Sequence, residues 1–397
     1  MNFDFDSITP RQNSSSYKWD ISDDPKLLPM WVADMDFKTA PAIIEALEQR
    51  VRHGIFGYTK VPATYFSAIQ HWFTTRHQFE IAREWILYTS GVVPALSAIL
   101  RAVTNPGDKV LVQTPVYNCF FSSIRNMGSE ILENPLIQID GRFEMDFADL
   151  EQKASLPGVK ALLLCNPHNP VGRAWTATEL RRLGEICQRY KVLMISDEIH
   201  CDLVFPHQKH QPYATLGADF LAQSITCLSP SKTFNIAGLQ IANIVVADPA
   251  LRSRIDKALN IHEVCDVNPF GVTATIAAYT KGTEWLDALR HYLYENYLLV
   301  EDFLSRELPA LRLTKQEATY LAWIDCRSLG VCSAVMTQQL SEKAHLRVNE
   351  GTLYGGAGEG FIRLNIACPR QVLTEGLVRL KSGLNVISSS DKSLSLI

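Results

Sequence analysis

The sequence predicts an α/β fold: a large domain with a mainly parallel central sheet covered by helices, and a smaller α+β domain. Three observations lead to this prediction. Short apolar runs alternate with amphipathic helical stretches through the middle of the chain, as in α/β domains. Most of these runs are almost continuously apolar, which is typical of strands covered on both faces. After about residue 285 the pattern changes to a long helical stretch followed by shorter elements.

The length of the chain, 397 residues, is enough for a large domain and a smaller one. We place the large domain at residues 41–285. We expect the first 40 or so residues to pack with the C-terminal part, so the smaller domain combines residues 1–40 and 286–397.

The first predicted helix runs from about Ala42 to His53. Its apolar residues, among them Ile43 and Leu47, keep helical spacing. Pro41 suits the first turn, and Gly54 can end the helix.

Six apolar runs are predicted strands, at residues 85–89, 109–113, 161–165, 191–196, 224–229 and 240–248. A helix begins between two of them at Thr176, where Thr176 and Glu179 fit a capping box. The smaller domain is predicted to hold a long helix at 285–306 and elements in the segments TYLAWIDC and GFIRLNIA.

Composition excludes several classes of partner. The net charge is -4, the isoelectric point is about 6.2, and no basic block occurs, so we expect no nucleic acid. No apolar run approaches the roughly 18 residues of a membrane span, and the acidic N-terminus lacks a signal peptide. The nine cysteines are scattered without a C-x-x-C pair. We therefore expect a cytoplasmic protein with free thiols, no metal and no membrane contact.

Lys232 is the strongest candidate for chemistry. It lies in Ser229-Pro-Ser-Lys232-Thr-Phe-Asn, directly after a predicted strand, and ligands of open α/β sheets bind at the carboxyl ends of strands. An amine there can condense with an aldehyde cofactor if its site lowers its pKa. Ser229 and Ser231 offer hydroxyl donors to a phosphate. Taken alone, the segment fits a surface lysine in a polar loop equally well.

Two further strand ends carry polar side chains. Asp197 ends the strand Lys191–Ser196, and a buried carboxylate can keep the pyridine nitrogen of pyridoxal phosphate (PLP) protonated. His200 can bond the phenolic oxygen of PLP or Asp197, or be a structural histidine. Asn169, in Asn-Pro-His-Asn169-Pro, can donate an amide N–H to that phenolic oxygen. Acidic or proline-rich turns without a ligand remain the alternative for each.

Three more residues complete the set. Gly91 lies in a Ser-Gly turn before a helix, where exposed N–H groups attract a phosphate, although a simple helix cap fits as well. Tyr117 follows the strand at 109–113 and can stack on a cofactor ring or pack in the core. Arg363 lies in a mostly apolar strand and needs an anion, either a substrate carboxylate or a buried ion-pair partner.

In this order, these segments resemble the aspartate-aminotransferase superfamily, fold type I of the PLP enzymes. The segments WVADMDF, HGIFGYTK, SDEIHCDLV, SPSKTFNIAG and YGGAGEGFIRLN resemble one branch, the MalY/PatB family of cystathionine β-lyases, over essentially the whole chain. The resemblance implies that Lys232 binds PLP covalently, Asp197 pairs with the pyridinium and Asn169 with the phenolate. It implies that Tyr117 stacks on the ring and Arg363 binds the substrate carboxylate.

The resemblance also implies how the phosphate and the subunits are arranged. Phosphate contacts fall on Gly91, Val92, Ser229 and Ser231, and on Tyr58 from the other subunit of a homodimer with shared active sites. Two positions depart from the pattern of many aminotransferases. Gln240 stands where they have an arginine, so neutral donors must hold the phosphate. His200 replaces a tyrosine, which suits the lyase branch.

The function implied is carbon–sulfur β-elimination on cystathionine or cysteine-type amino acids, giving a thiol, pyruvate and ammonia. An aminotransferase remains the first alternative, because both reactions begin with removal of the Cα proton. A regulatory protein that binds a transcription activator is the second, because relatives in this branch have that role. The physiological sulfur substrate stays open.

Overall fold

A seven-stranded sheet forms the centre of the molecule. The computed structural model describes residues 3–262 and 267–394 of the chain. The strand order is β2-β10-β9-β8-β7-β3-β4, with β9 to β4 mutually parallel and β10 antiparallel to both neighbours. The strands are β2 (Ile86–Thr89), β3 (Lys109–Val112), β4 (Glu130–Glu133), β7 (Val159–Cys165), β8 (Leu193–Asp197), β9 (Ser224–Leu228) and β10 (Ala242–Val245). All six predicted strands are therefore confirmed, and β4 is the member that the sequence did not reveal.

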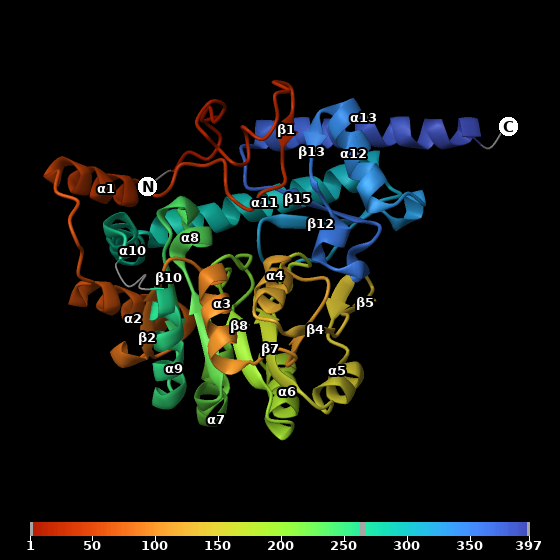
Figure 1. The fold of residues 1–397 in the computed structure, drawn as a ribbon. Coiled ribbons are helices and arrows are strands. Elements are labelled where there is room, and N and C mark those ends of the chain that lie inside the picture. Colours follow the sequence, from red (N-terminus) through yellow and green to blue (C-terminus); the bar gives the residue numbers. More distant parts are fainter. Residues whose placement is uncertain (1–2, 263–266, 395–397) are drawn as a thin grey trace.

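Helices cover both faces of this sheet (Figure 1). On one face α3 (Val92–Val103), α4 (Cys119–Asn126) and α9 (Pro249–Leu259) share a core with the strands. On the other face lie α5 (Phe147–Ala154), α6 (Ala177–Arg189) and α7 (Ala218–Ala222). The mainly parallel α/β architecture predicted from the apolar runs is confirmed.

The two helix starts predicted from the sequence, near Pro41 and at Thr176, are both confirmed. The helix α1 runs over Pro41–His53, with the proline in its first turn and Gly54 in the left-handed conformation, φ 75°, at its end. The capping box of α6 is complete: the hydroxyl of Thr176 accepts from the N–H of Glu179, and the Glu179 carboxylate accepts from the N–H of Thr176. The helix α1 packs on α10 (Pro269–Lys281), which packs on α2 (Ala63–His77).

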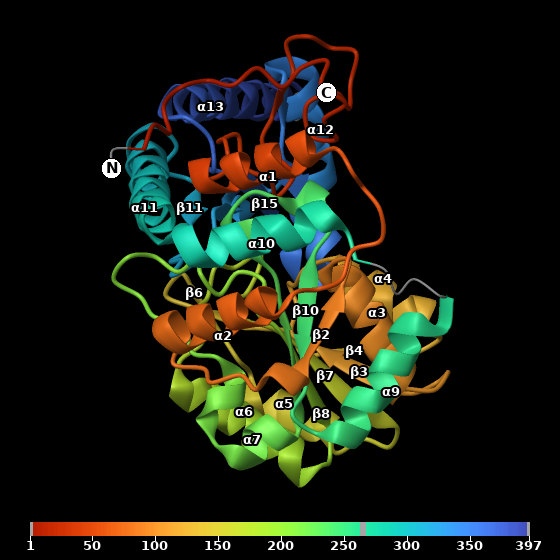
Figure 2. The same cartoon turned by 90° about the vertical axis from the view of Figure 1, so that its left-hand side faces the viewer.

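A second, antiparallel sheet of four strands lies above the central sheet in Figure 1, in the order β11-β12-β15-β14. Three helices accompany it in Figures 1 and 2. These elements are β11 (Arg312–Leu313), β12 (Leu321–Asp325), β14 (Asn349–Glu350), β15 (Phe361–Asn365), α11 (Thr283–Glu307), α12 (Ser333–Ala344) and α13 (Arg370–Leu394). The predicted long helix is therefore α11, and the segments TYLAWIDC and GFIRLNIA contain β12 and β15.

The N-terminal segment packs with this second sheet, as expected. The short strand β1 (Leu28–Pro29) pairs in parallel with β13 (Leu346–Arg347). The N–H of Asp36 donates to the carbonyl of Ala367, and the N–H of Asn365 donates to the carbonyl of Met30. The domain boundaries at residues 41 and 285 stay a prediction. Among the described helices, none is long and apolar enough to cross a membrane.

Candidate active site

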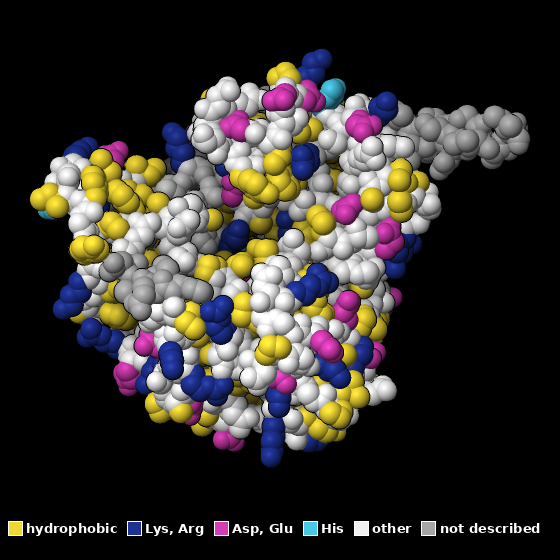
Figure 3. Space-filling model, viewed as in Figure 1, with side chains coloured by type: hydrophobic (Ala, Val, Ile, Leu, Met, Phe, Trp, Pro, Cys, Tyr) yellow, Lys and Arg dark blue, Asp and Glu magenta, His cyan; other side chains and the backbone are white. Residues whose placement is uncertain are grey.

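A cavity of about 460 Å³ lies where the carboxyl ends of β7, β8 and β9 meet β15. This volume falls in the usual range of small-molecule sites. Figure 3 shows the face of the molecule on which the upper and lower parts are separated by a hollow. Nine of the predicted site residues line the cavity: Gly91, Val92, Tyr117, Asn169, Asp197, His200, Ser231, Lys232 and Arg363. Residues that are up to about 270 positions apart in the chain are thus brought together.

Lys232 projects into this cavity from α8 (Pro230–Thr233), which begins two residues after β9. Its Nζ donates to the carbonyl oxygen of Ala33 at 2.7 Å. Burial lowers the pKa of Lys232 to about 8, although the carboxylate of Asp34 acts in the opposite direction. A larger share of the amine is therefore neutral at physiological pH than for an exposed lysine, which is the form that attacks an aldehyde or takes a proton.

Asp197 is the last residue of β8 and is buried against the same cavity. Its carboxylate accepts from the N–H of Ile199 at 3.1 Å. Burial, with a contribution from the neighbouring Glu198, raises the pKa of Asp197 to about 7. Glu198 points elsewhere and accepts from Ser196 and His210. Asp197 is thus a buried carboxyl group without a cationic hydrogen-bond partner of its own, at the wall of a cavity that can supply one.

Asn169 and Arg363 contact each other at the opposite wall. The Oδ1 of Asn169 accepts from Arg363 at 3.1 Å, which leaves the amide N–H groups of Asn169 for another acceptor. Arg363 also donates to the carbonyl of Trp31 at 2.8 Å, while its buried Nε has no partner. A buried guanidinium with an unused N–H and no carboxylate partner fits an anionic ligand better than the structural ion pair.

His200 is buried, and its Nδ1 has no hydrogen-bond partner. Burial lowers the pKa of His200 to about 3, so the imidazole is neutral. Its ring lies edge-on to Tyr320, with centroids 6.2 Å apart. A neutral histidine in this position can take part in one hydrogen bond with a ligand in the cavity.

The start of α3 forms the side suited to a phosphate. Gly91 precedes the helix in extended backbone, and Val92 is its first residue. Free N–H groups at a helix start attract anions. Ser231 lines the cavity, but Ser229 does not: its hydroxyl caps α8 and donates to the carbonyl of Ile241 at 2.6 Å. Ser229 therefore supports the segment that carries Lys232 in this structure, rather than facing the cavity.

The two predicted tyrosines differ in position. Tyr117 lines the cavity, and burial raises its pKa well above the usual value. Tyr58 lies outside the cavity and is 94% exposed, so its own chain provides it with no packing.

The sequence did not reveal several residues that line or support the cavity. Trp31 and Ala33 lie in an irregular segment, Asn349 begins β14 of the second sheet, and Tyr354 ends the short 3-10 helix after it; all four line the wall. Tyr320 donates to the carbonyl of Ala33 at 3.0 Å. None of these positions follows a predicted strand or begins a predicted helix. In the sequence, only the family segments around residues 31–37 and 354 indicated that they belong to the site.

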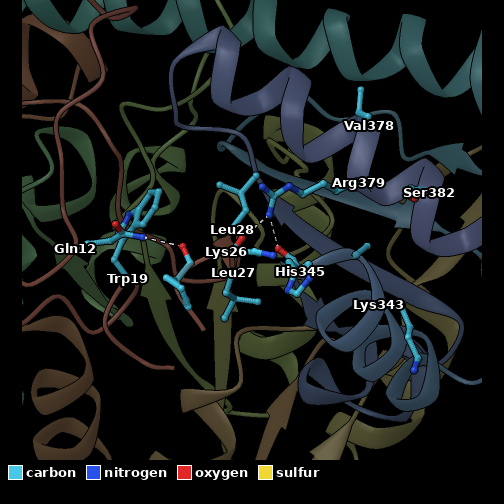
Figure 4. A pocket seen from close by; sticks show the side chains of 12 residues that line it. Gln12, Trp19, Lys26, Leu27, Leu28, Lys343, His345, Val378, Arg379 and Ser382 are labelled. Atoms are coloured by element: carbon cyan, nitrogen blue, oxygen red, sulfur yellow. Dashed lines mark hydrogen bonds between the residues drawn. The ribbon is translucent and has the colours of Figure 1, made fainter. Parts of the chain in front are cut away.

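Two other features of the molecule compete with this site. A hollow of about 500 Å³ lies between residues 12–28 and the helices α12 and α13 (Figure 4). Two of its basic groups have partners: Arg379 donates to the carbonyls of Lys26 and His345, and His345 pairs with Asp24. None of the predicted site residues lies there.

The second feature is a cluster of side chains of the types that bind metal ions. Among the described residues, His77, Cys201 and Asp202 bring their ligand atoms within 4.8 Å of one another. The carboxylate of Asp202 already accepts from His77 at 2.7 Å and from Thr233 at 3.0 Å. Since Thr233 follows Lys232, this buried carboxylate holds the segment that positions the amine.

Comparisons with known proteins agree with the geometry. The family model of aminotransferase class I and II matches residues 25–380. The chain is 44% identical to cystathionine beta-lyase PatB of Bacillus subtilis, over 96% of this chain and 100% of the relative. It is 36% identical to protein MalY of Escherichia coli, over 97% and 100%.

The fold agrees as closely. The structure of cystalysin from Treponema denticola, which contains a pyridoxal 5'-phosphate cofactor, superposes with a TM-score of 0.95. That comparison covers 98% of this chain and 100% of cystalysin at 36% identity. The chain therefore belongs to the aminotransferase class I and II family, in the branch that contains PatB and MalY.

Proposed function

We propose that this protein is a PLP-dependent carbon–sulfur β-lyase that cleaves cystathionine and cysteine-type amino acids to a thiol, pyruvate and ammonia. The observation that carries the proposal is the single cavity in which the amine of Lys232, the buried carboxyl of Asp197 and the guanidinium of Arg363 meet. PatB, which covers nearly the whole chain, is named a cystathionine β-lyase.

The residues present fit PLP. When bound, this cofactor supplies an aldehyde for covalent attachment and a pyridinium ring that withdraws electrons from the substrate. Lys232 offers the amine for the aldehyde. Asp197 is buried at the wall with a carboxyl that burial holds partly protonated, and a pyridinium nitrogen would restore its charge. Asn169 keeps its amide N–H groups for the phenolic oxygen.

The phosphate would lie at the start of α3. The N–H groups after Gly91 are donors at this helix start, and the hydroxyl of Ser231 also lines the cavity. Gln240 stands where many aminotransferases have an arginine. Its side chain is neutral and exposed and does not line the wall, so this position supplies no cation to the phosphate.

For catalysis, the chain must bind the amino acid and move one proton. Arg363 holds the α-carboxylate, since a planar guanidinium binds two oxygens at once. The free amine of Lys232 takes the Cα proton; positioned bases of this kind contribute about 10²–10⁴-fold. Burial of Lys232 keeps a share of the amine neutral for this step.

The test of this function separates elimination from amino-group transfer. We expect the purified yellow protein to release pyruvate and a thiol from L-cystathionine in equal amounts. Incubated with an amino acid and a keto acid instead, it should form little new amino acid. A new amino acid as the main product, with no pyruvate, would overturn the lyase assignment in favour of an aminotransferase.

We further propose that the active unit is a two-fold dimer, in which Tyr58 reaches the phosphate of the neighbouring subunit. The support is an exposed apolar segment: Ile55 is 67% exposed, Phe56 55% and Tyr58 94%. Contiguous exposed apolar residues are typical of interfaces. The absence of a cation at Gln240 makes an additional phosphate donor more valuable.

Mixed dimers test this arrangement. Lys232→Ala chains are refolded together with Tyr58→Ala chains under conditions that exchange subunits. If Tyr58 acts across the interface, each mixed dimer has one site with both defects and one intact site. Since about half of the dimers are mixed, roughly a quarter of native activity should return.

The control mixture combines Lys232→Ala with Asp197→Asn. Both residues line the same chain's cavity, so no site is repaired and activity should stay at the average of the two parents. The same average for the Tyr58 mixture, or full activity of a monomer in sedimentation, would contradict the shared site.

We propose the cytoplasm as its compartment. The cysteines that the structure describes are all free, and most are buried, which suits a reducing environment.

A further inference from the structure

The segment Trp31–Phe37 crosses the cavity without regular secondary structure. Four successive backbone carbonyls in it each accept a hydrogen bond from a side chain that is distant in the sequence or lies on the N-terminal segment. The donors are Arg363 and Asn349 for Trp31, Asn365 for Val32, Lys232 and Tyr320 for Ala33, and Asn365 and Lys18 for Asp34. Asn235 binds the backbone of Met35 and Phe37 on the far side. The backbone in front of Lys232 is therefore held at fixed positions.

The carbonyl of Ala33 is the one that contacts the reactive amine. It accepts from Nζ of Lys232 at 2.7 Å and from the hydroxyl of Tyr320 at 3.0 Å. A carbonyl oxygen has two lone pairs, so both are used. Tyr320 is 1% exposed and lies immediately before β12, and the bond to Ala33 gives its buried hydroxyl a partner.

We propose that Tyr320 and the Ala33 carbonyl form the holding site for the free Lys232 amine, and that this site orients the amine as the base. A neutral amine that donates one N–H to Ala33 turns its lone pair toward the cavity. The lone pair then takes the Cα proton, and the electrons of the C–H bond stay with the substrate carbon. Tyr320 acts through Ala33 and Lys232 and is a positioning residue.

The hydroxyl of Tyr320 also affects the charge of the amine. Because it donates to the same carbonyl, it weakens that carbonyl as an acceptor for an ammonium group and so favours the neutral amine. The other groups that act on the charge of Lys232 are Asp34, Asp197, Arg363 and Cys119. Removing the hydroxyl leaves all four in place.

The first test compares Tyr320→Phe with a matched control, Tyr297→Phe. Tyr297 is also buried and donates to a backbone carbonyl, but that carbonyl is the one of Thr314, at 3.0 Å, and not the one of Ala33. Exchange of the Cα proton of L-alanine is followed by NMR in heavy water with PLP-loaded protein. We expect Tyr320→Phe to lower kcat for exchange about 10- to 100-fold with KM within about twofold, since misplacing a reacting group has costs of this size.

Tyr297→Phe should exchange like the unmodified protein. Equal exchange rates in the two variants would overturn the inference. The inference rests on the proposed role of Lys232 as base and not on the later loss of sulfur. Exchange without pyruvate release from cystathionine would therefore refute the lyase function while leaving the holding site intact.

A second test needs no turnover. Covalent attachment of PLP to cofactor-free protein requires the neutral Lys232 amine, and its rate follows the growth of the visible absorption band. Tyr320→Phe should move the midpoint of this rate to higher pH, because the amine is then more easily protonated. A merely structural role, checked by equal unfolding temperatures, would leave the midpoint where Tyr297→Phe has it, and that result would also count against the inference.

Discussion

Lys232→Ala is expected to abolish pyruvate release and to remove the visible absorption band of the bound cofactor. Both effects have one cause, because the same amine attaches the cofactor and removes the Cα proton. Loss of the proton-transfer role alone should cost about 10²–10⁴-fold. In the unmodified protein, borohydride should fix the cofactor to a peptide that contains Lys232.

The structure offers two comparisons for this result. Lys18 is more deeply buried than Lys232, but it pairs with Asp36 at 2.7 Å and does not line the cavity. Lys38 is exposed near the same N-terminal segment, and Lys38→Ala should keep both the visible band and the activity. A borohydride adduct on any lysine other than Lys232 would contradict the assignment.

Most of the central sheet could be predicted because its strands are buried on both faces. In β7, for example, only Lys160 is exposed, so the apolar run is almost unbroken. The strand β4 was missed because its sequence, Glu-Ile-Leu-Glu, is short and half polar at the edge of the sheet. Local pattern therefore predicts interior strands better than edge strands.

The site residues at strand ends could be predicted for a related reason. The carboxyl ends of neighbouring parallel strands meet at one edge, so Asn169, Asp197 and Lys232 had to lie near each other once their strands were recognised. The segment Trp31–Phe37 follows no such rule. Its path depends on donors such as Asn235 and Asn365, which lie about 200 to 330 residues away in the sequence.

Ser229 illustrates another limit of local sequence. A serine before a short helix can either cap the helix or face a ligand, and both uses need the same residue in the same position. The structure assigns the hydroxyl to the cap and to the carbonyl of Ile241. Only the position of the Ile241 carbonyl, just before β10, decides between the two.

Asp197→Asn is expected to have opposite effects on catalysis and on the stability of the cofactor-free protein. An amide cannot hold the pyridine nitrogen protonated, so pyruvate release should fall at least about 10²-fold, equivalent to about 2.7 kcal/mol. The folded-state pKa of Asp197 is raised from 3.8 to about 7, mainly by burial. The folded protein thus keeps a proton that the unfolded chain has released, and the free energy of unfolding falls as pH rises from about 4 to about 7.

At pH 8 the cofactor-free protein therefore carries the cost of a buried carboxylate, and Asp197→Asn removes it. We expect the variant to unfold about 3 °C or more above the unmodified protein at pH 8, and to show no such gain at pH 4. Asp202 is the matched control. Burial would raise its pKa, but the hydrogen bond from His77 and the charge of Arg76 lower it below the usual value. Asp202→Asn should therefore lower the unfolding temperature at pH 8. If both variants unfolded at equally lowered temperatures, the carboxylate of Asp197 would not be a buried charge that lacks a partner in the cofactor-free protein.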